Sequence, residues 1–460
     1  MGAFDNIKLQ GREKRLGTLS AYTGSAHNLL IREDDTQNIR TFSQGTYDEI
    51  IYSFQALNKV EESVIIIHGP EGCSSIEIND EVNFYVTNLN ERDTILGGEE
   101  KLRETVYAAY KKHNPKVIFV ISTPVVAINN DDISAVVLEL EDEIETKIIP
   151  IYADGFKSKT AINGYDLIFH AIGRYLLRNL EKDKKENYLN LISLSESAGD
   201  LKEVLKIIKA LNVNINVVPK YSNLEGLKKV VSGKATIALN DDEGYFLGTA
   251  LENEYDVPFI KTNLPIGLKN TEKFIEVISE IFGKSEDIHK LFKKEKYFFE
   301  NLINKKPLKN LKIYIDLKTS KAIALASLIK ELGGEVIGIT IDEVDEINRK
   351  KLETLKYDID IHVASGQIFE TANILNDLKP SIYIGEVGKT SWVSQYGIIP
   401  ITIDNIVIYG FNGGKNLVSV INKALKNKKL IDNIANNSDE FYKKTWLKKS
   451  KNWYIKQEVK

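Results

Sequence analysis

The chain has 460 residues, a length that favours about three domains because one hydrophobic core rarely serves so many residues. Hydrophobic residues make up 43% and charged residues 27% of the sequence, which excludes an intrinsically disordered protein. The 61 basic and 65 acidic residues give a net charge of −4 and are mixed along the chain, so no basic stripe indicates a nucleic-acid partner.

The cysteine count and the apolar runs indicate the compartment. Cys73 is the only cysteine, which excludes an intramolecular disulfide and favours a reducing environment. Residues 1–15 are polar and charged and lack the apolar core of a signal peptide. No apolar run approaches the roughly 18–20 residues that a membrane span needs. We therefore expect a cytoplasmic protein that binds neither membranes nor nucleic acid.

Short β-branched runs alternate with longer helical segments, a pattern typical of parallel sheets with crossover helices. In the first part of the chain, strands are predicted at 63–67, 116–121 and 147–151. A helix is predicted at 99–113, because acidic residues open its first turn, basic residues close its last turn and Asn114-Pro115 follows. These elements define a predicted N-terminal α/β domain over residues 1–186.

Two further sets of elements follow the first. The second set contains predicted strands at 188–192, 214–218 and 235–239 and helices at 200–211, 223–232 and 285–306. The third contains predicted strands at 311–315, 335–339, 360–363, 381–384 and 399–403. We predict an α/β protein of three Rossmann-like domains, each a parallel sheet flanked by helices, with the later domains at 187–307 and 308–460. Ligands of such domains bind beyond the carboxyl ends of the strands.

Several motifs favour ordinary structural roles. Residues 383–390, Tyr-Ile-Gly-Glu-Val-Gly-Lys-Thr, fall one residue short of a phosphate-binding loop, which disfavours nucleotide binding. Residues 410–415, Gly-Phe-Asn-Gly-Gly-Lys, are typical of a tight strand-to-helix turn. The six histidines form no pair at helical spacing, which disfavours a mononuclear zinc site. The carboxylates at 131–132 and 241–243 are predicted on loops, where helix capping and solvation explain them.

The segment His68-Gly-Pro-Glu-Gly-Cys73 directly follows the predicted buried strand at 63–67. Two glycines and a proline shape a tight turn, and the thiol follows it. A cysteine at the start of a helix after such a turn has backbone N–H groups directed toward it, which lowers its pKa and favours thiolate, although Glu71 opposes this effect. The residues leave two interpretations open, a functional thiolate and a small buried apolar side chain.

The segment from Ile65 to Cys73 resembles the cluster-ligand loop of the nitrogenase component 1 family. This family includes the nitrogenase cofactor-assembly scaffold and dark-operative protochlorophyllide reductase. The similarity covers about residues 10–425 and continues in other segments, namely Arg40-Thr-Phe-Ser-Gln44, Leu96-Gly-Gly-Glu-Glu-Lys-Leu102, Asn130-Asp-Asp-Ile133, Asp154-Gly-Phe156, Leu264-Pro-Ile-Gly267, Gly333-Gly334, Lys379-Pro380 and Gly397-Ile-Ile-Pro400. Their order and spacing together carry the resemblance.

The resemblance implies an iron–sulfur cluster at a subunit interface, to which a subunit supplies up to three cysteines. Here the first expected position falls near Thr46 and the third near Pro124, and neither is a cysteine. A cubane cluster normally needs four protein ligands. Cys73 would therefore be one metal ligand of a cluster completed by a partner with three cysteines. His68, Gly69, Pro70 and Gly72 would shape the loop that holds the cofactor.

This ligand arithmetic predicts a β-like oxidoreductase subunit that relays electrons beside an α-like subunit, in an α2β2 heterotetramer. The resemblance also implies an ATP-dependent iron–sulfur reductase as the electron donor. Because the chain has no second cysteine for the active-site metal cofactor of the family, we expect the α-like partner to bind most of the substrate. Two alternatives stay open, a scaffold subunit for assembly of a nitrogenase-type metal cofactor and a metal-free structural partner. The sequence leaves the substrate open.

Overall fold

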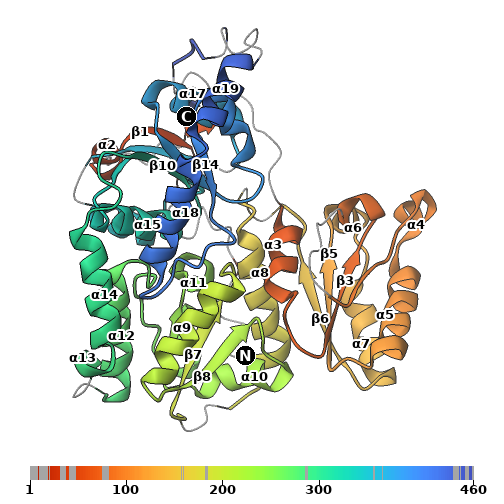
Figure 1. The fold of residues 1–460 in the computed structure, drawn as a ribbon. Helices are drawn as coiled ribbons and strands as arrows, with labels where there is room; N and C mark the ends of the chain where they lie inside the picture. The colour runs from red at the N-terminus through yellow and green to blue at the C-terminus, as the bar shows by residue number, and fades with distance from the viewer. Residues whose placement is uncertain are drawn as a thin grey trace. The chain divides into compact units, whose positions relative to one another are not determined.

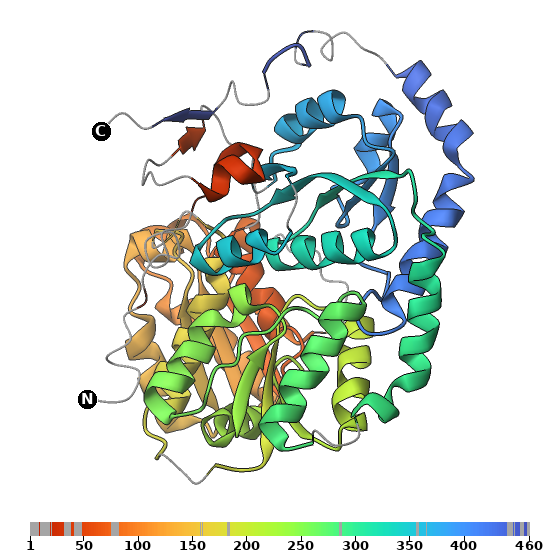
Figure 2. The ribbon, with the colours of Figure 1, turned by 90° about the vertical axis from the view of Figure 1, so that its left-hand side faces the viewer.

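The structure of the chain is a computed structural model that describes residues 9, 19, 21–31, 38–40, 48–74, 82–156, 158, 160–181, 185–284, 288–355, 358–364, 366–438, 445, 447–450 and 455–457. These residues form two compact units (Figures 1 and 2). The first unit comprises Met1–Arg15, Tyr47–Ser195 and Val213–Lys261, and the second comprises Leu16–Thr46, Glu196–Asn212 and Thr262–Lys460. No helix of the described residues is long and apolar enough to cross a membrane.

The first unit contains a four-stranded parallel sheet with the strand order β4-β3-β5-β6. Its strands are β3 (Ser63–His68), β4 (Phe84–Val86), β5 (Val117–Ser122) and β6 (Lys147–Tyr152). Successive side chains of a strand point to opposite faces, so both faces of this apolar sheet must be covered. Val64 and Ile66 pack with α5 (Glu99–His113) and α7 (Ile133–Glu143), while Ile65 and Ile67 pack with α3 (Glu49–Leu57) and α8 (Asn163–Ile172). Figure 1 shows these two helix pairs on opposite sides of the sheet.

A second parallel sheet of the first unit has the order β8-β7-β9. Its strands are β7 (Tyr188–Ser193), β8 (Asn214–Pro219) and β9 (Ala235–Ala238). The helix α10 (Leu224–Lys229), a short 3₁₀ turn (Val230–Ser232) and α11 (Asp241–Tyr255) accompany it. The predicted helix at 223–232 is therefore split between an α-helical and a 3₁₀ part. The same apolar core continues from the first sheet to α10 and α11.

The second unit contains a six-stranded sheet with the order β1-β12-β11-β10-β13-β14. The parallel strands are β10 (Lys312–Asp316), β11 (Glu335–Ile341), β12 (Asp360–Val363), β13 (Ile382–Gly385) and β14 (Ile399–Thr402). The edge strand β1 (Tyr22–Ser25) is antiparallel to β12. Because β10 and β13 are neighbours while the chain passes through β11 and β12 between them, this order is that of a doubly wound fold.

Helices and one further strand pair complete the second unit. The helices are α2 (Ala26–Leu30), α9 (Ala198–Ala210), α12 (Leu268–Phe282), α13 (Ile288–Leu291), α14 (Lys293–Asn304), α15 (Thr319–Glu331), α16 (Glu346–Glu353), α17 (Ile368–Leu378), α18 (Gly413–Leu425) and α19 (Lys428–Asn437), with a 3₁₀ segment η5 (Ser391–Tyr396). The strands β2 (Asn38–Arg40) and β15 (Ile455–Gln457) pair antiparallel to each other.

The predicted fold class is confirmed, because all three predicted sheets are present and their central strands are parallel. The predicted helix at 99–113 has the same bounds as α5. The boundaries at 186 and 307 stay a prediction, and β1, which was assigned to the N-terminal domain by position, pairs with the C-terminal sheet. The loop prediction for residues 241–243 was wrong. These carboxylates form the buried first turn of α11, where the helix dipole favours negative charge.

Candidate functional site

The loop from His68 to Cys73 lies at the carboxyl edge of the four-stranded sheet. His68 is the last residue of β3 and is fully buried. Its register partner on β5 is Ser122, so residues 123 and 124 lie at the same edge as the loop. The loop ends in a single 3₁₀ turn, η2 (Glu71–Ser74), in which the N–H of Cys73 donates to the carbonyl of Pro70 at 3.1 Å. The predicted site residues thus form one continuous turn at the sheet edge where parallel α/β proteins bind ligands.

A hydrogen-bond chain fixes the base of this loop. The Gly69 N–H donates to Thr87 Oγ1 at 2.9 Å, and this hydroxyl lies 3.1 Å from His68 Nδ1. On the other side of the ring, His68 Nε2 lies 3.2 Å from Asp131 Oδ2, which also accepts the Gly98 N–H at 3.0 Å. When Asp131 is ionised it can only accept, and His68 then carries its proton on Nε2. The Thr87 hydroxyl has two acceptors within reach, His68 Nδ1 at 3.1 Å and the Gly69 carbonyl at 3.3 Å.

Burial decides the charge of the His68–Asp131 pair. Loss of water around the ring lowers the pKa of His68 from 6.5 to about 4, although Glu99 acts in the opposite direction. Burial also raises the pKa of Asp131, while the hydrogen bond from the Gly98 N–H lowers it. Near neutral pH the histidine is therefore uncharged, and its contact with Asp131 is a hydrogen bond between a neutral donor and an acceptor that is only 1% exposed.

The two loop glycines differ in what surrounds them. A Cβ atom at Gly69 would lie 2.3 Å from Thr123 Oγ1 and 2.6 Å from Thr123 Cγ2, so only glycine fits there. A Cβ atom at Gly72 would meet no atom within 4 Å. Gly69 is therefore required for packing, whereas a side chain at Gly72 would enter open space.

We expect Gly69→Ala to lower the free energy of unfolding by about 2 kcal/mol, because the added methyl group overpacks the Thr123 contact. Adding Thr123→Ala removes the two closest atoms and should restore most of the loss. Gly72→Ala is the matched control and should change stability by less than about 0.5 kcal/mol. Urea unfolding of the four proteins checks this prediction, and equal losses for the two glycine variants would contradict it.

Cys73 is a free, partly exposed thiol. Burial raises its pKa, and the nearby carboxylate of Asp48 raises it further. The predicted lowering of this pKa was therefore wrong. The turn η2 is too short to direct several aligned N–H groups at the sulfur, so desolvation and Asp48 decide the result. In the isolated chain Cys73 is a neutral thiol near pH 7.

The chain supplies one cysteine ligand for an iron–sulfur cluster, whereas a whole cluster needs several. Thr46 and residues 41–44 of the similar upstream segment lie outside the described residues. Pro124 is the first residue of α6 (Pro124–Asn129) and offers no donor atom. Within the described part of the chain, no group of three or more His, Cys, Asp or Glu side chains could hold a metal ion. Because Cys73 is the only cysteine of the chain, the other thiolates of an iron–sulfur cluster at Cys73 have to come from another chain.

Sequence reasoning missed Thr87 and Thr123 and gave Asp131 only a loop role. Asp132 does cap α7, since its carboxylate accepts the Ala135 N–H at 3.0 Å, as predicted for a carboxylate at this position. Asp131 instead links His68 to Gly98 across sequence separations of 63 and 33 residues. The segment Asn130-Asp-Asp-Ile133 was marked by the resemblance, whereas nothing in the sequence indicates Thr87.

The glycine-rich segment at 383–390 contains a paired lysine. Lys389 Nζ lies 3.3 Å from Asp316 Oδ1 and 3.5 Å from Glu386 Oε2. Asp316 Oδ2 also accepts the hydroxyl of the buried Tyr383 at 2.7 Å. The charge of Lys389 is thus balanced by carboxylates, whereas a phosphate-binding lysine leaves its charge for the ligand. The prediction that this segment binds no nucleotide stays a prediction.

The parallel sheets, the doubly wound order of the larger sheet and the cysteine turn at a strand end define a multidomain α/β protein with a thiol at a ligand-binding edge. A family model described as nitrogenase component 1 type oxidoreductase matches residues 53–426. The chain therefore belongs to the nitrogenase component 1 type oxidoreductase family, and this confirms the resemblance on which the sequence-based prediction rested.

Individual relatives agree with this assignment. The nitrogenase iron-molybdenum cofactor biosynthesis protein NifE of Methanococcus maripaludis is 27% identical over 390 residues, which cover 80% of this chain and 81% of that protein. The nitrogenase molybdenum-iron protein alpha chain of Methanosarcina barkeri is 26% identical over 299 residues, 60% of this chain and 56% of that protein. A solved structure of nitrogenase Cp1 at pH 6.5 matches with a TM-score of 0.72 and 18% identity, over 89% of this chain and 97% of that chain, which shows the shared fold.

Proposed function

We propose that this chain is the β-like, one-cysteine subunit of a nitrogenase component 1-type oxidoreductase complex. Cys73 donates one thiolate to an iron–sulfur cluster whose other ligands come from an α-like subunit. The observation that carries the proposal is the position of Cys73. It is a partly exposed thiol on a hydrogen-bonded turn at the carboxyl edge of a parallel sheet. Among the described residues, no group of three or more His, Cys, Asp or Glu side chains could hold a metal ion.

The residues of the turn have separate roles in this proposal. The Pro70 carbonyl holds the Cys73 backbone, and the His68–Asp131 contact holds the strand end from which the turn departs. The space around the Gly72 Cα is open, so this part of the loop does not obstruct a bulky inorganic group. Cys73 releases its proton when it becomes a ligand, so its raised pKa makes binding weaken toward acidic pH. When bound, the cluster supplies one-electron transfer.

Exposed apolar side chains at the same sheet edge support the proposal that other chains cover it. Ile95 and Leu96 at the end of α4 (Glu91–Leu96) are 81% and 71% exposed, Ile128 on α6 is 73% exposed, and Phe156 after β6 is 68% exposed. The helices α4 and α6 contact each other, and Figure 1 shows them at one end of the sheet. Exposed apolar patches of this kind mark protein interfaces. An α-like subunit and an ATP-dependent iron–sulfur reductase are the partners we propose.

A cofactor-assembly scaffold is the second candidate. The relative described above that covers four fifths of this chain is named for cofactor biosynthesis, whereas the β-like assignment rests on the cysteine count alone. Both candidates use Cys73 in the same way, so they share the cluster test. They differ in the final product, because a scaffold passes a metal cofactor to another protein and a reductase turns over a substrate that is still to be identified.

The test is anaerobic co-expression of this chain with a candidate α-like subunit that carries three cluster cysteines. The purified complex should contain iron and acid-labile sulfide and a visible absorbance band that dithionite bleaches. The chain expressed alone should contain neither iron nor sulfide, because one thiolate cannot hold a cubane. A stable complex without iron would reject the proposal and favour the metal-free structural partner.

A further inference from the structure

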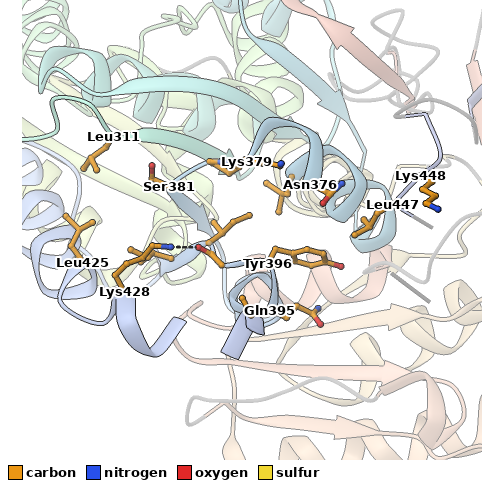
Figure 3. Close-up of a pocket in the computed structure, with 16 residues that line it drawn as sticks. Leu311, Asn376, Lys379, Ser381, Gln395, Tyr396, Leu425, Lys428, Leu447 and Lys448 are labelled. Carbon is orange, nitrogen blue, oxygen red and sulfur yellow. Dashed lines mark hydrogen bonds between the residues drawn. The ribbon is translucent and has the colours of Figure 1, made fainter. Parts of the chain in front are cut away.

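A cavity of about 840 Å³ opens at the amino edge of the six-stranded sheet in the second unit. It is bounded by the residues that precede β10, β13 and β14, by the ends of α17 and α18, and by η5 and α19. Figure 3 shows Ser381 and Lys428 toward one end of the lining and Tyr396 and Leu447 toward the other. The volume lies in the range of small-molecule binding sites. Open parallel α/β sheets bind ligands at the opposite, carboxyl edge, so this cavity needs its own explanation.

The lining carries three lysines and no carboxylate. Lys428 Nζ is already used, because it donates to the Gly397 carbonyl at 2.8 Å and to Asp432 Oδ1 at 2.7 Å. Lys379 and Lys448 form no ion pair with any residue that the structure describes. Two lysines without an ion pair among the described residues, at a cavity with no carboxylate in its lining, favour an anionic ligand.

The remaining lining is part polar and part apolar. Asn376 and Ser381 add neutral hydrogen-bond donors, and the amine of Lys379 is directed toward Asn376 in Figure 3. Leu311, Leu425 and Leu447 add partly exposed apolar side chains to the lining. A small inorganic anion would contact only the donors and leave these apolar side chains in contact with water. The combination therefore fits an anionic head group that carries an apolar body.

Hydrogen bonds outside the lining hold two walls of the cavity in place. The side-chain amide of the buried Asn373 donates to the Lys449 carbonyl at 2.9 Å, which fixes the segment with Leu447 and Lys448 against α17. Ser438 Oγ lies 3.0 Å from the Ala435 carbonyl of its own helix and 3.3 Å from the Gln395 carbonyl, which places the end of α19 beside η5. The walls of the cavity are thus held by contacts within the second unit.

We propose that this cavity binds an amphipathic organic anion. Lys379 and Lys448 attract its carboxylate or phosphate head group, and Leu311, Leu425 and Leu447 contact its hydrocarbon body. This site is separate from the Cys73 loop and does not depend on the function proposed for that loop.

Isothermal titration of the full chain with octanoate and with octyl phosphate tests the proposal. We expect one amphiphile bound per chain, and the tighter of the two identifies the head group. Lys379→Ala combined with Lys448→Ala should weaken binding by about tenfold or more, because two charge-assisted contacts are lost. The matched control combines Lys426→Ala with Lys429→Ala, two neighbouring lysines outside the lining, and should keep the wild-type affinity.

Three results would overturn the proposal. The first is that neither amphiphile binds more tightly than about 1 mM. The second is that inorganic phosphate binds as tightly as the amphiphiles, which would leave only an adventitious ion on surface lysines. The third is that the control pair weakens binding as much as the cavity pair.

Discussion

Cys73→Ser should reduce the iron and labile sulfide of the complex by about tenfold or more, because a hydroxyl group is a poor ligand for an iron–sulfur cluster. The fold should survive, since Cys73 is only partly buried and the hydrogen bond that holds its turn is made by its backbone N–H. Metal analysis of the anaerobically purified complex gives the ratio, and thermal unfolding of the same samples checks the fold.

Glu71→Gln is the matched control for this substitution. Glu71 lies in the same 3₁₀ turn and is exposed, and the change removes a charge without removing a ligand. This variant should retain wild-type iron content. Full iron content in Cys73→Ser, or equal losses in the two variants, would show that Cys73 is no ligand.

His68→Ala has the largest expected effect on stability, a loss of about 3–4 kcal/mol. The substitution leaves a cavity at a fully buried position and deprives Asp131 and Thr87 of their partner. Chemical denaturation at pH 7 measures the loss. His113→Ala is the control, because His113 closes the last turn of α5 near the surface, and it should cost less than about 1 kcal/mol. Similar losses for the two alanine variants would show that burial and hydrogen bonding of His68 do not stabilise the fold.

The low pKa of His68 predicts how stability depends on pH. The unfolded chain binds a proton on His68 near pH 6.5, whereas the folded chain resists protonation until about pH 4. Stability from this group is therefore complete above pH 6.5 and is lost as the pH falls to about 4, by roughly 3 kcal/mol in total. The raised pKa of Asp131 acts in the opposite sense.

Comparison with His68→Gln isolates this effect, because glutamine keeps a donor for Asp131 and does not titrate. We expect the free energy of unfolding of the wild type to fall more steeply than that of the variant between pH 6.5 and pH 4. Urea unfolding at half-unit steps checks the two slopes. Parallel curves for the two proteins would show that His68 is not held neutral by burial.

The fold class could be predicted from the sequence because its signals are local. The bounds of α5 were correct since acidic residues, basic residues and an Asn-Pro pair mark its two ends. The buried helix α8 escaped prediction because it begins after Ile162 with Asn163-Gly164 and has no side-chain cap, so no start signal marks it. The strand β1 escaped because its partner β12 lies more than 300 residues away, at His362 and its neighbours.

The candidate site was only partly predictable for the same reason. The turn residues are contiguous and could be recognised together, whereas Thr87 and Asp131 join them only in three dimensions. The pKa of Cys73 was predicted in the wrong direction because Asp48 lies 25 residues upstream, and burial depends on the packed structure. Local backbone dipoles and the neighbouring Glu71 were the influences visible in the sequence.

Alkylation of Cys73 before and after cluster removal tests its role as a ligand most directly. Because the chain has only one cysteine, mass spectrometry of the peptide that contains it reports one site. In the intact anaerobic complex, iodoacetamide should leave Cys73 unmodified, and after iron is removed by oxidation and chelation it should modify the thiol. Equal modification before and after removal would contradict a metal–thiolate bond at Cys73.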